Sequence, residues 1–190
     1  MTDGWDASVE AWIASMGETG DFSREHVLDT PMLERLRRAA PEAVLDLGCG
    51  EGRFCRMIAP NVDHVAGIDP TEALISHDKA KGGADYHVAR AENLPFDNNS
   101  FDLAVSYLSL IDIPDVPIAL AEAHRVLRPN GLLLIANLNP WTTASQSKGT
   151  PVKNSDGTTT LTMDRYLDAF PSWAEWSGIR IQNWHRPLAF

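Results

Sequence analysis

The 190-residue sequence has few cysteines, no long apolar run and no charged start that leads into one. Its two cysteines, Cys49 and Cys55, are too few for a disulfide framework, and without a second pair or clustered histidines they do not make a zinc site. We therefore expect two reduced thiols and no metal. No segment reaches the length of a membrane span or resembles a signal peptide. These absences favour a cytoplasmic protein that does not bind membranes.

Basic side chains are also scarce. The chain has 16 Lys and Arg against 26 Asp and Glu, which gives a formal net charge of −10. Binding to nucleic acid draws on a basic surface, so the charge excludes nucleic acid as a non-specific partner and leaves proteins or small molecules, including cationic ones. The length and the 44% hydrophobic content predict one domain, residues 1–190, with a substantial core.

The middle of the chain alternates between apolar strand patterns and helical patterns. This alternation predicts an α/β fold with a doubly wound, mostly parallel sheet that carries helices on both faces, and it makes residues 41–140 the core. The strands are expected at 43–47, 63–68, 84–89, 101–108 and 132–138, and the helices at 52–59, 71–79 and 115–127.

Segments of different character flank this core. Residues 1–40 contain a short amphipathic pattern that includes Trp5 and Trp12, and a second helix from an N-cap at Ser23 to Ala39, so we interpret them as a helical lid.

Residues 141–190 are interpreted as a loop and a substrate-side cap. Two short strands are expected there, at 158–163 and 179–184. The dense aromatic side chains of this segment fit either packing under the cap or a binding wall. They are Tyr166, Phe170, Trp173, Trp176 and Trp184.

The stretch VLDLGCGEGRF, residues 44–54, ends a buried strand in a glycine-rich turn. Gly48 and Gly50 allow a sharp turn and a close approach of the backbone to a ligand. A dinucleotide fingerprint fails because Arg53 stands where its third glycine belongs, and no Gly-Lys-Ser/Thr phosphate loop is present. Asp46 would repel a phosphate but would attract an ammonium group beside a carboxylate. The amino-acid end of S-adenosylmethionine has that chemistry.

The second strand ends in the motif VAGIDP. Asp69 in this place is able to accept both hydroxyls of a ribose, or to cap the helix that begins near Thr71. Pro70 is placed to pack on an adenine face. The glycine-rich turn upstream favours the ribose interpretation.

Four successive motifs resemble those of class I S-adenosylmethionine-dependent methyltransferases of the small-molecule type. The resemblance covers residues 43–137 and implies a Rossmann-like fold, S-adenosylmethionine as cofactor and a small-molecule methyl acceptor. It implies that Gly48 and Gly50 pass beneath the methionine part, which Asp46 orients. The motifs are VLDLGCGEGRF, GIDP, ARAENLPFDNNSFDLAVS and EAHRVLRPNGLLLIAN.

The same resemblance assigns the rest of the cofactor site. Asp69 holds the ribose, Ala91 and Glu92 lie near the adenine, and Ser106 offers its backbone carbonyl to the cofactor's amino group. Many relatives carry an acid where this chain has Arg90, and arginine has no acceptor for the adenine amine. We therefore expect weaker selectivity for adenine. Past the fifth strand, either the two short strands close the sheet or the chain is truncated, and we favour truncation, which would expose a sheet edge and permit a dimer.

No residue is clearly identified as a general base by the sequence. The candidates are His185, Tyr107 and His26, and His185 is preferred because it lies in the aromatic segment. Arg24 is expected to meet the cofactor carboxylate. The leading hypothesis is a methyltransferase; the alternatives are a cofactor-binding protein without methyl transfer and a nicotinamide-dependent oxidoreductase, against which the fingerprint argues.

Overall fold

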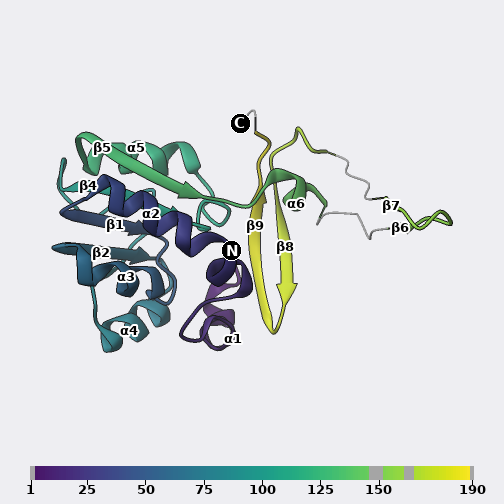
Figure 1. The fold of residues 1–190 in the computed structure, drawn as a ribbon, viewed down its shortest axis with the longest axis horizontal. Helices are drawn as coiled ribbons and strands as arrows, with labels where there is room; N and C mark the ends of the chain where they lie inside the picture. Colours follow the sequence, from purple (N-terminus) through teal and green to yellow (C-terminus); the bar gives the residue numbers. More distant parts are fainter. Residues whose placement is uncertain (1–2, 146–151, 161–164, 189–190) are drawn as a thin grey trace.

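The computed structural model describes residues 3–145, 152–160 and 165–188. Its centre is a five-stranded parallel sheet in the order β3-β2-β1-β4-β5 (Figure 1). The strands are β1 (Ala43–Leu47), β2 (His64–Asp69), β3 (Asp85–Val88), β4 (Phe101–Tyr107) and β5 (Leu127–Ala136).

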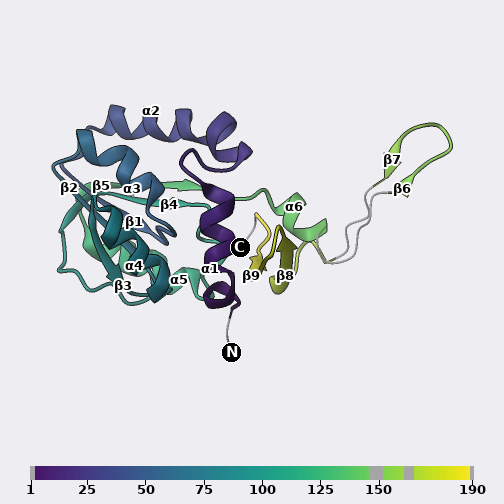
Figure 2. The same cartoon turned by 90° about the horizontal axis from the view of Figure 1, so that it is seen from below.

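Helices cover both faces of this sheet, which confirms the predicted doubly wound architecture (Figure 2). One face packs against α2 (Asp29–Ala39) and α3 (Arg53–Ile58), and the other packs against α5 (Val116–Val126). All five residues of β1 are buried, because a central strand of a parallel sheet has protein on both faces. The remaining short elements of this core are η2 (Ala59–Asn61) and α4 (Glu72–Lys81).

The order of the strands reverses between β1 and β4. From β1 the chain moves outward through β2 and β3, and it then returns to the other side of β1 to form β4 and β5. In such sheets ligands bind outside the carboxyl ends of the strands at this reversal. Asp46 of β1 pairs with Val105 of β4 at this point, so the predicted glycine-rich turn opens directly into the crevice.

In the N-terminal segment and the core, two boundaries differ from the expectation by more than two residues, and the others differ by at most two. β5 begins at Leu127, before the RPNG sequence, because Arg128 bonds Asp102 and the pairing shifts register between Phe101 and Leu103, which accommodates the turn residues within the strand. The helix expected from Ser23 begins as a π-helix, η1 (Arg24–Leu28), and Ser23 makes no capping hydrogen bond.

The N-terminal helix α1 (Trp5–Met16) packs on the C-terminal strand β9 (Ile179–His185). Figure 1 shows β9 and β8 (Phe170–Trp176) as a hairpin beyond the sheet, next to α1. Ile179 and Ile181 of β9 share one apolar cluster with Trp12 and Met16 of α1. The N-terminal helix α1 and the C-terminal strand β9 therefore pack together beside the crevice.

The two short strands expected in the C-terminal segment do not close the sheet. Residues 159–160 form β7 (Thr159–Thr160), which pairs with β6 (Val152–Lys153), and residues 161–164 lie outside the described residues. β9 pairs with β8, a strand that was not predicted in the aromatic segment. Within the described residues the parallel sheet ends at β5, where Leu132 and Ile135 are exposed.

One further helix, α6 (Pro140–Ser145), follows β5. Each helix in the described parts of the chain is too short or too polar to cross a bilayer.

Candidate cofactor and acceptor site

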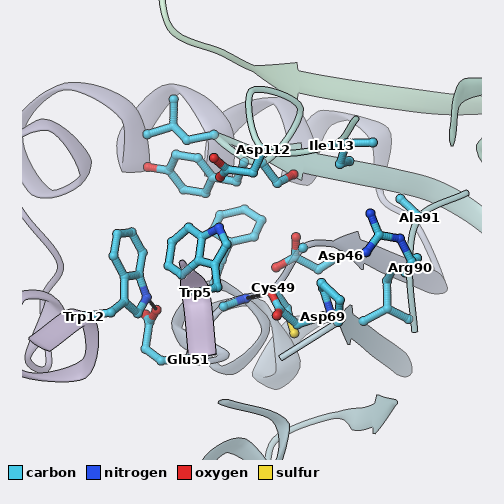
Figure 3. A pocket seen from close by; sticks show the side chains of 18 of the residues that line it. Trp5, Trp12, Asp46, Cys49, Glu51, Asp69, Arg90, Ala91, Asp112 and Ile113 are labelled. Carbon is cyan, nitrogen blue, oxygen red and sulfur yellow. Dashed lines mark hydrogen bonds between the residues drawn. The ribbon is translucent and has the colours of Figure 1, made fainter. Parts of the chain in front are cut away.

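A pocket lies at the carboxyl ends of β1, β2 and β4 (Figure 3). The end of β2 contributes Asp69 to its lining, and α1 contributes Trp12. The loops that follow β1, β3 and β4 contribute Gly48, Ala91 and Ser109. The site is therefore built where the reversal of strand order predicts a ligand, and residues from far apart in the sequence complete it.

The glycine-rich turn requires glycine for two distinct reasons. Gly48 and Gly50 have φ angles of +73° and +60°, in the left-handed region that favours glycine. A Cβ on Gly48 would also stand 2.6 Å from the Cβ of Ser109. The turn is fixed by a hydrogen bond of 2.9 Å from the Gly48 N–H to the carbonyl of Ile68. The backbone thus passes along the pocket without side chains in the way.

Asp46 lies at the base of the pocket and is 1% exposed. Its Oδ2 accepts a hydrogen bond of 3.5 Å from the thiol of Cys55, whereas its Oδ1 is buried without a partner in the described chain. Burial raises the pKa of Asp46 to about 7. A buried carboxylate with an unused oxygen favours a cationic hydrogen-bond donor as its partner.

Asp69 ties the glycine-rich turn to the helix that follows β2. Its Oδ1 accepts the N–H of Thr71 at 2.9 Å, and its Oδ2 accepts the N–H of Gly50 at 3.2 Å. Burial raises the pKa of Asp69 to about 6. The two interpretations of Asp69 are thus compatible, since each oxygen that binds the backbone keeps a second lone pair toward the pocket.

The opposite end of the pocket is lined by Pro70, Ala91 and Glu92, as the resemblance implied for the adenine end. Arg90 lines the same end, and its Nε lies 3.6 Å from Oε2 of Glu92. The expected weaker selectivity for adenine remains a prediction. The carboxylate of Glu92, which also lines this end of the pocket, is an acceptor that Arg90 does not provide.

Ser106 does not line the pocket. It is fully buried, and its hydroxyl shares a hydrogen bond of 2.7 Å with the hydroxyl of Ser109, whose Cβ approaches Gly48. The residues of the same connection that line the pocket are Tyr107, Leu108 and Ser109. The chain turns into the crevice after Ser106, and the expected contact of the Ser106 backbone carbonyl with the cofactor's amino group stays a prediction.

His185, the preferred base, lies away from the pocket. It is fully buried, its Nδ1 is 2.7 Å from the hydroxyl of Thr143, and its Nε2 is 2.9 Å from the carbonyl of Tyr166. A carbonyl only accepts, so Nε2 carries the proton and Nδ1 faces the hydroxyl. Both ring nitrogens are used within the fold, and we do not propose His185 as the base.

The other two candidates are also occupied or remote. The Tyr107 ring lines the pocket, but its hydroxyl donates a hydrogen bond of 2.8 Å to Asp29, and burial raises its pKa further. His26 packs on Phe22 and its side chain is half exposed. Neither offers a free basic atom to the pocket.

The N-terminal segment supplies aromatic and charged groups to the pocket. Trp12 donates a hydrogen bond of 2.7 Å from Nε1 to Oε2 of Glu51, and its ring meets that of Trp5 edge to face. Arg24 lies with its guanidinium carbon 5.2 Å from the Trp12 ring centroid and 5.7 Å from that of Tyr107. Arg24 thus lines the pocket, and the sequence analysis expected this arginine to meet the carboxylate of the cofactor.

The aromatic side chains of the C-terminal segment are not a wall of this pocket. Every second residue of β9 is buried toward α1 and the loop after β4, while Trp173 and Trp176 of β8 are partly exposed. Sequence reasoning missed Glu51, Trp5 and Asp112 as lining residues. One feature of the sequence indicates Asp112 as a site residue: it is an isolated acid within the apolar run Leu110–Ile113.

Comparison with known proteins agrees with this geometry. The methyltransferase domain family matches residues 45–135. A protein of Mycolicibacterium smegmatis named "Probable S-adenosylmethionine-dependent methyltransferase" is 31% identical over 75% of this chain and 55% of its own length. A ubiquinone biosynthesis O-methyltransferase of Rhizobium johnstonii is 33% identical over 63% of this chain and 47% of its own length. The chain thus spans about half the length of these curated relatives.

Solved structures show the same relationship. An S-adenosylmethionine-dependent methyltransferase from Mesorhizobium loti has a TM-score of 0.70 and 29% identity, and the match covers 82% of this chain and 74% of that one. The family match extends from β1 to β5 and includes the strands at whose carboxyl ends the pocket lies. On sequence motifs, topology and these matches together, residues 45–135 match the methyltransferase domain family, and the chain has the fold and the motifs of class I S-adenosylmethionine-dependent methyltransferases.

Proposed function

We propose that this protein transfers a methyl group from S-adenosylmethionine to a small-molecule acceptor. The observation that carries the proposal is the buried, unpartnered Oδ1 of Asp46 beside the glycine-rich turn. An ammonium group is a donor of the charge and size that such an oxygen requires. Arg24 lines the same pocket and offers a cation for the neighbouring carboxylate of the cofactor.

The remaining lining residues also fit the cofactor. Asp69 would accept ribose hydroxyls with the lone pairs that Gly50 and Thr71 leave free, and Pro70 and Ala91 would contact the adenine. When bound, S-adenosylmethionine supplies an electrophilic methyl group on a positively charged sulfur. The protein then contributes position and the exclusion of water, for which Trp5 and Trp12 of α1 lie over the pocket.

The negative charge of the chain supports a small acceptor over nucleic acid. The second candidate is a protein that binds the cofactor without methyl transfer. The observation that favours it is that none of the three candidate bases, His185, Tyr107 and His26, presents a free basic atom to the pocket.

Calorimetric titration with S-adenosylmethionine and S-adenosylhomocysteine tests the binding, and methyl-labelled cofactor with a panel of phenols, carboxylic acids and amines tests the transfer. Saturable binding near equimolar ratio with transfer of label is the expected result. Binding without label transfer across the panel would favour the second candidate, and absence of binding by the folded chain would refute both.

A further inference from the structure

The loop between β4 and α5 carries a carboxylate into the pocket. Figure 3 shows Asp112 across the pocket from Cys49, Glu51 and Asp69 of the cofactor side. Its Oδ1 accepts a short hydrogen bond from the side-chain amide of Asn183 in β9. In the described chain no protein group bonds its Oδ2. One oxygen is therefore held by the fold and the other is free for a ligand.

The C-terminal strand fixes the loop that carries Asp112. The N–H of Trp184 donates a hydrogen bond of 2.6 Å to the carbonyl of Ile111. The guanidinium of Arg186 donates to the carbonyls of Leu110 at 3.0 Å and Pro114 at 3.2 Å, and also to that of Ile113. Donors from β9 and the residue after it thus bind the residues on both sides of Asp112, so this carboxylate has a defined position.

The charged groups that face Asp112 come from four parts of the chain. Burial is the main reason that its pKa lies well above the ordinary value, and Asp69 of β2 and Asp3 of the N-terminal segment raise it further. The amide of Asn183 and the positive charge of Arg24 in η1 act in the opposite direction. Arg186, which follows β9, also interacts with the Asp112 charge. A further positive charge in the pocket would favour the ionised carboxylate.

We propose that Asp112 binds the methyl acceptor and takes its proton, and that Asn183 is the positioning residue that orients it. The proposal rests on the proposed function and names the acceptor's class: a small molecule whose nucleophilic atom carries a proton, as in a hydroxyl or an amine. Trp5 and Ile113, which line the pocket near Asp112 in Figure 3, would contact the body of that molecule.

The chemistry of the step balances without another reactant. The acceptor's lone pair forms the new bond to the methyl carbon as the sulfur–carbon bond breaks and its electron pair stays on sulfur. The acceptor's proton passes to Oδ2 of Asp112, which becomes neutral. The positive sulfur of the bound cofactor favours the ionised form of Asp112 before the step, and the neutral thioether product does not. The carboxylate is therefore ionised and able to accept a proton when the methyl donor is bound.

A proton-linkage experiment tests this without any acceptor. Calorimetric titrations at pH 7 in buffers of different ionisation enthalpy give the protons released when each ligand binds. We expect S-adenosylmethionine to release up to about one proton more than S-adenosylhomocysteine, because only the former carries the sulfonium charge. Asp112→Asn is expected to bind both ligands and to abolish the difference, whereas Asp3→Asn, a matched change of a carboxylate lining the same pocket, is expected to keep it.

A second variant keeps the test decisive if Asp112→Asn does not fold. Asn183→Leu keeps the size of the side chain and removes the hydrogen-bond donor, so it is expected to raise the pKa of Asp112. The difference in protons released by the two ligands should then become smaller at pH 7 and larger at higher pH. A merely structural role for Asn183 would not move this pH dependence. Binding of both ligands with a proton difference that survives Asp112→Asn overturns the assignment and leaves the proposed function standing. Failure of the folded wild type to bind either ligand overturns both.

Discussion

The indole of Trp12 donates a hydrogen bond of 2.7 Å from Nε1 to Oε2 of Glu51, so the N-terminal helix is attached to the glycine-rich turn. Both partners are more than nine-tenths buried and both line the pocket. Through this bond, α1, which is not part of the sheet, holds Glu51, the residue after Gly50, in place. Cofactor binding is therefore expected to depend on α1 as well as on the motif itself.

Trp12→Phe removes this donor and leaves the Glu51 carboxylate buried with its bond unmade. A buried charged acceptor without its donor costs on the order of 1–3 kcal/mol. We expect the affinity for S-adenosylhomocysteine to fall about tenfold or more, since 1.4 kcal/mol is a factor of ten. Isothermal calorimetry measures the loss. Trp173→Phe, at a partly exposed tryptophan outside the pocket, serves as control, and equal affinity of the two variants would contradict the prediction.

Gly48→Ala separates steric exclusion from backbone strain. Gly48 and Gly82 share a φ of +73°, but a Cβ on Gly48 meets Ser109 at 2.6 Å, whereas a Cβ on Gly82 meets nothing within 4 Å. Both alanine variants place a Cβ on a residue with a positive φ, a strain of about 1–3 kcal/mol. Only Gly48→Ala is expected to lose further stability and cofactor affinity. Denaturant unfolding of the two variants compares them, and an equal loss of stability would show that the approach to Ser109 is unimportant.

The stability of the free protein is expected to fall as the pH rises from about 4 to about 7. Burial raises the pKa of Asp46 from 3.8 to about 7, so in this window the folded state keeps a proton that the unfolded state has lost. The stabilising contribution is complete below the unfolded pKa and is lost as the pH passes the folded pKa. Urea unfolding between pH 4 and pH 8, in the absence of cofactor, measures the effect.

Asp46→Asn removes the titrating group and keeps the size of the side chain. The variant is expected to lose part of the fall in stability with pH, and the remainder belongs to the other carboxyl groups whose pKa burial raises: Asp69, to about 6, Asp78, to about 8, and Asp112. It is also expected to bind S-adenosylmethionine more weakly at pH 7. Parallel stability profiles for the variant and the wild type would contradict the assignment of the raised pKa to Asp46.

His185→Ala is expected to act on stability. The side chain is fully buried, packs on Phe170, and uses both ring nitrogens with Thr143 and Tyr166. Removing a buried ring and its bonds costs about 2–5 kcal/mol. Thermal unfolding with and without S-adenosylhomocysteine reports the effect. His26→Ala, at an exposed histidine, is the control with an expected change within about 0.5 kcal/mol. An unchanged unfolding temperature for His185→Ala would refute this role.

The parts of the site that sequence reasoning predicted are those encoded by local motifs. Asp46, Gly48, Gly50 and Asp69 stand at the ends of neighbouring strands, and the carboxyl ends of parallel strands meet at one edge. These residues line the pocket as expected. The position of His185 was misjudged because an aromatic-rich segment does not reveal which of its faces is buried.

The residues that were missed depend on contacts between distant segments. Glu51 is bonded to Trp12 of α1, and Asp112 is bonded to Asn183 of β9, 71 positions later. Hydrophobic periodicity places each residue within its own element and is silent about such pairings. β8 was missed because Pro171 and the polar residues of the segment hide the alternation of a strand.

The contact between α1 and β9 joins segments that are among the most distant in the sequence. Arg180 donates its N–H to the hydroxyl of Ser8, 172 positions earlier, and Gln182 bonds the carbonyl of Asp3. Loop closure over such separations slows folding. During synthesis, α1 has no partner strand until β9 has left the ribosome. We expect the parallel sheet to form first in refolding and the capacity to retain a ligand to appear in a later, slower phase.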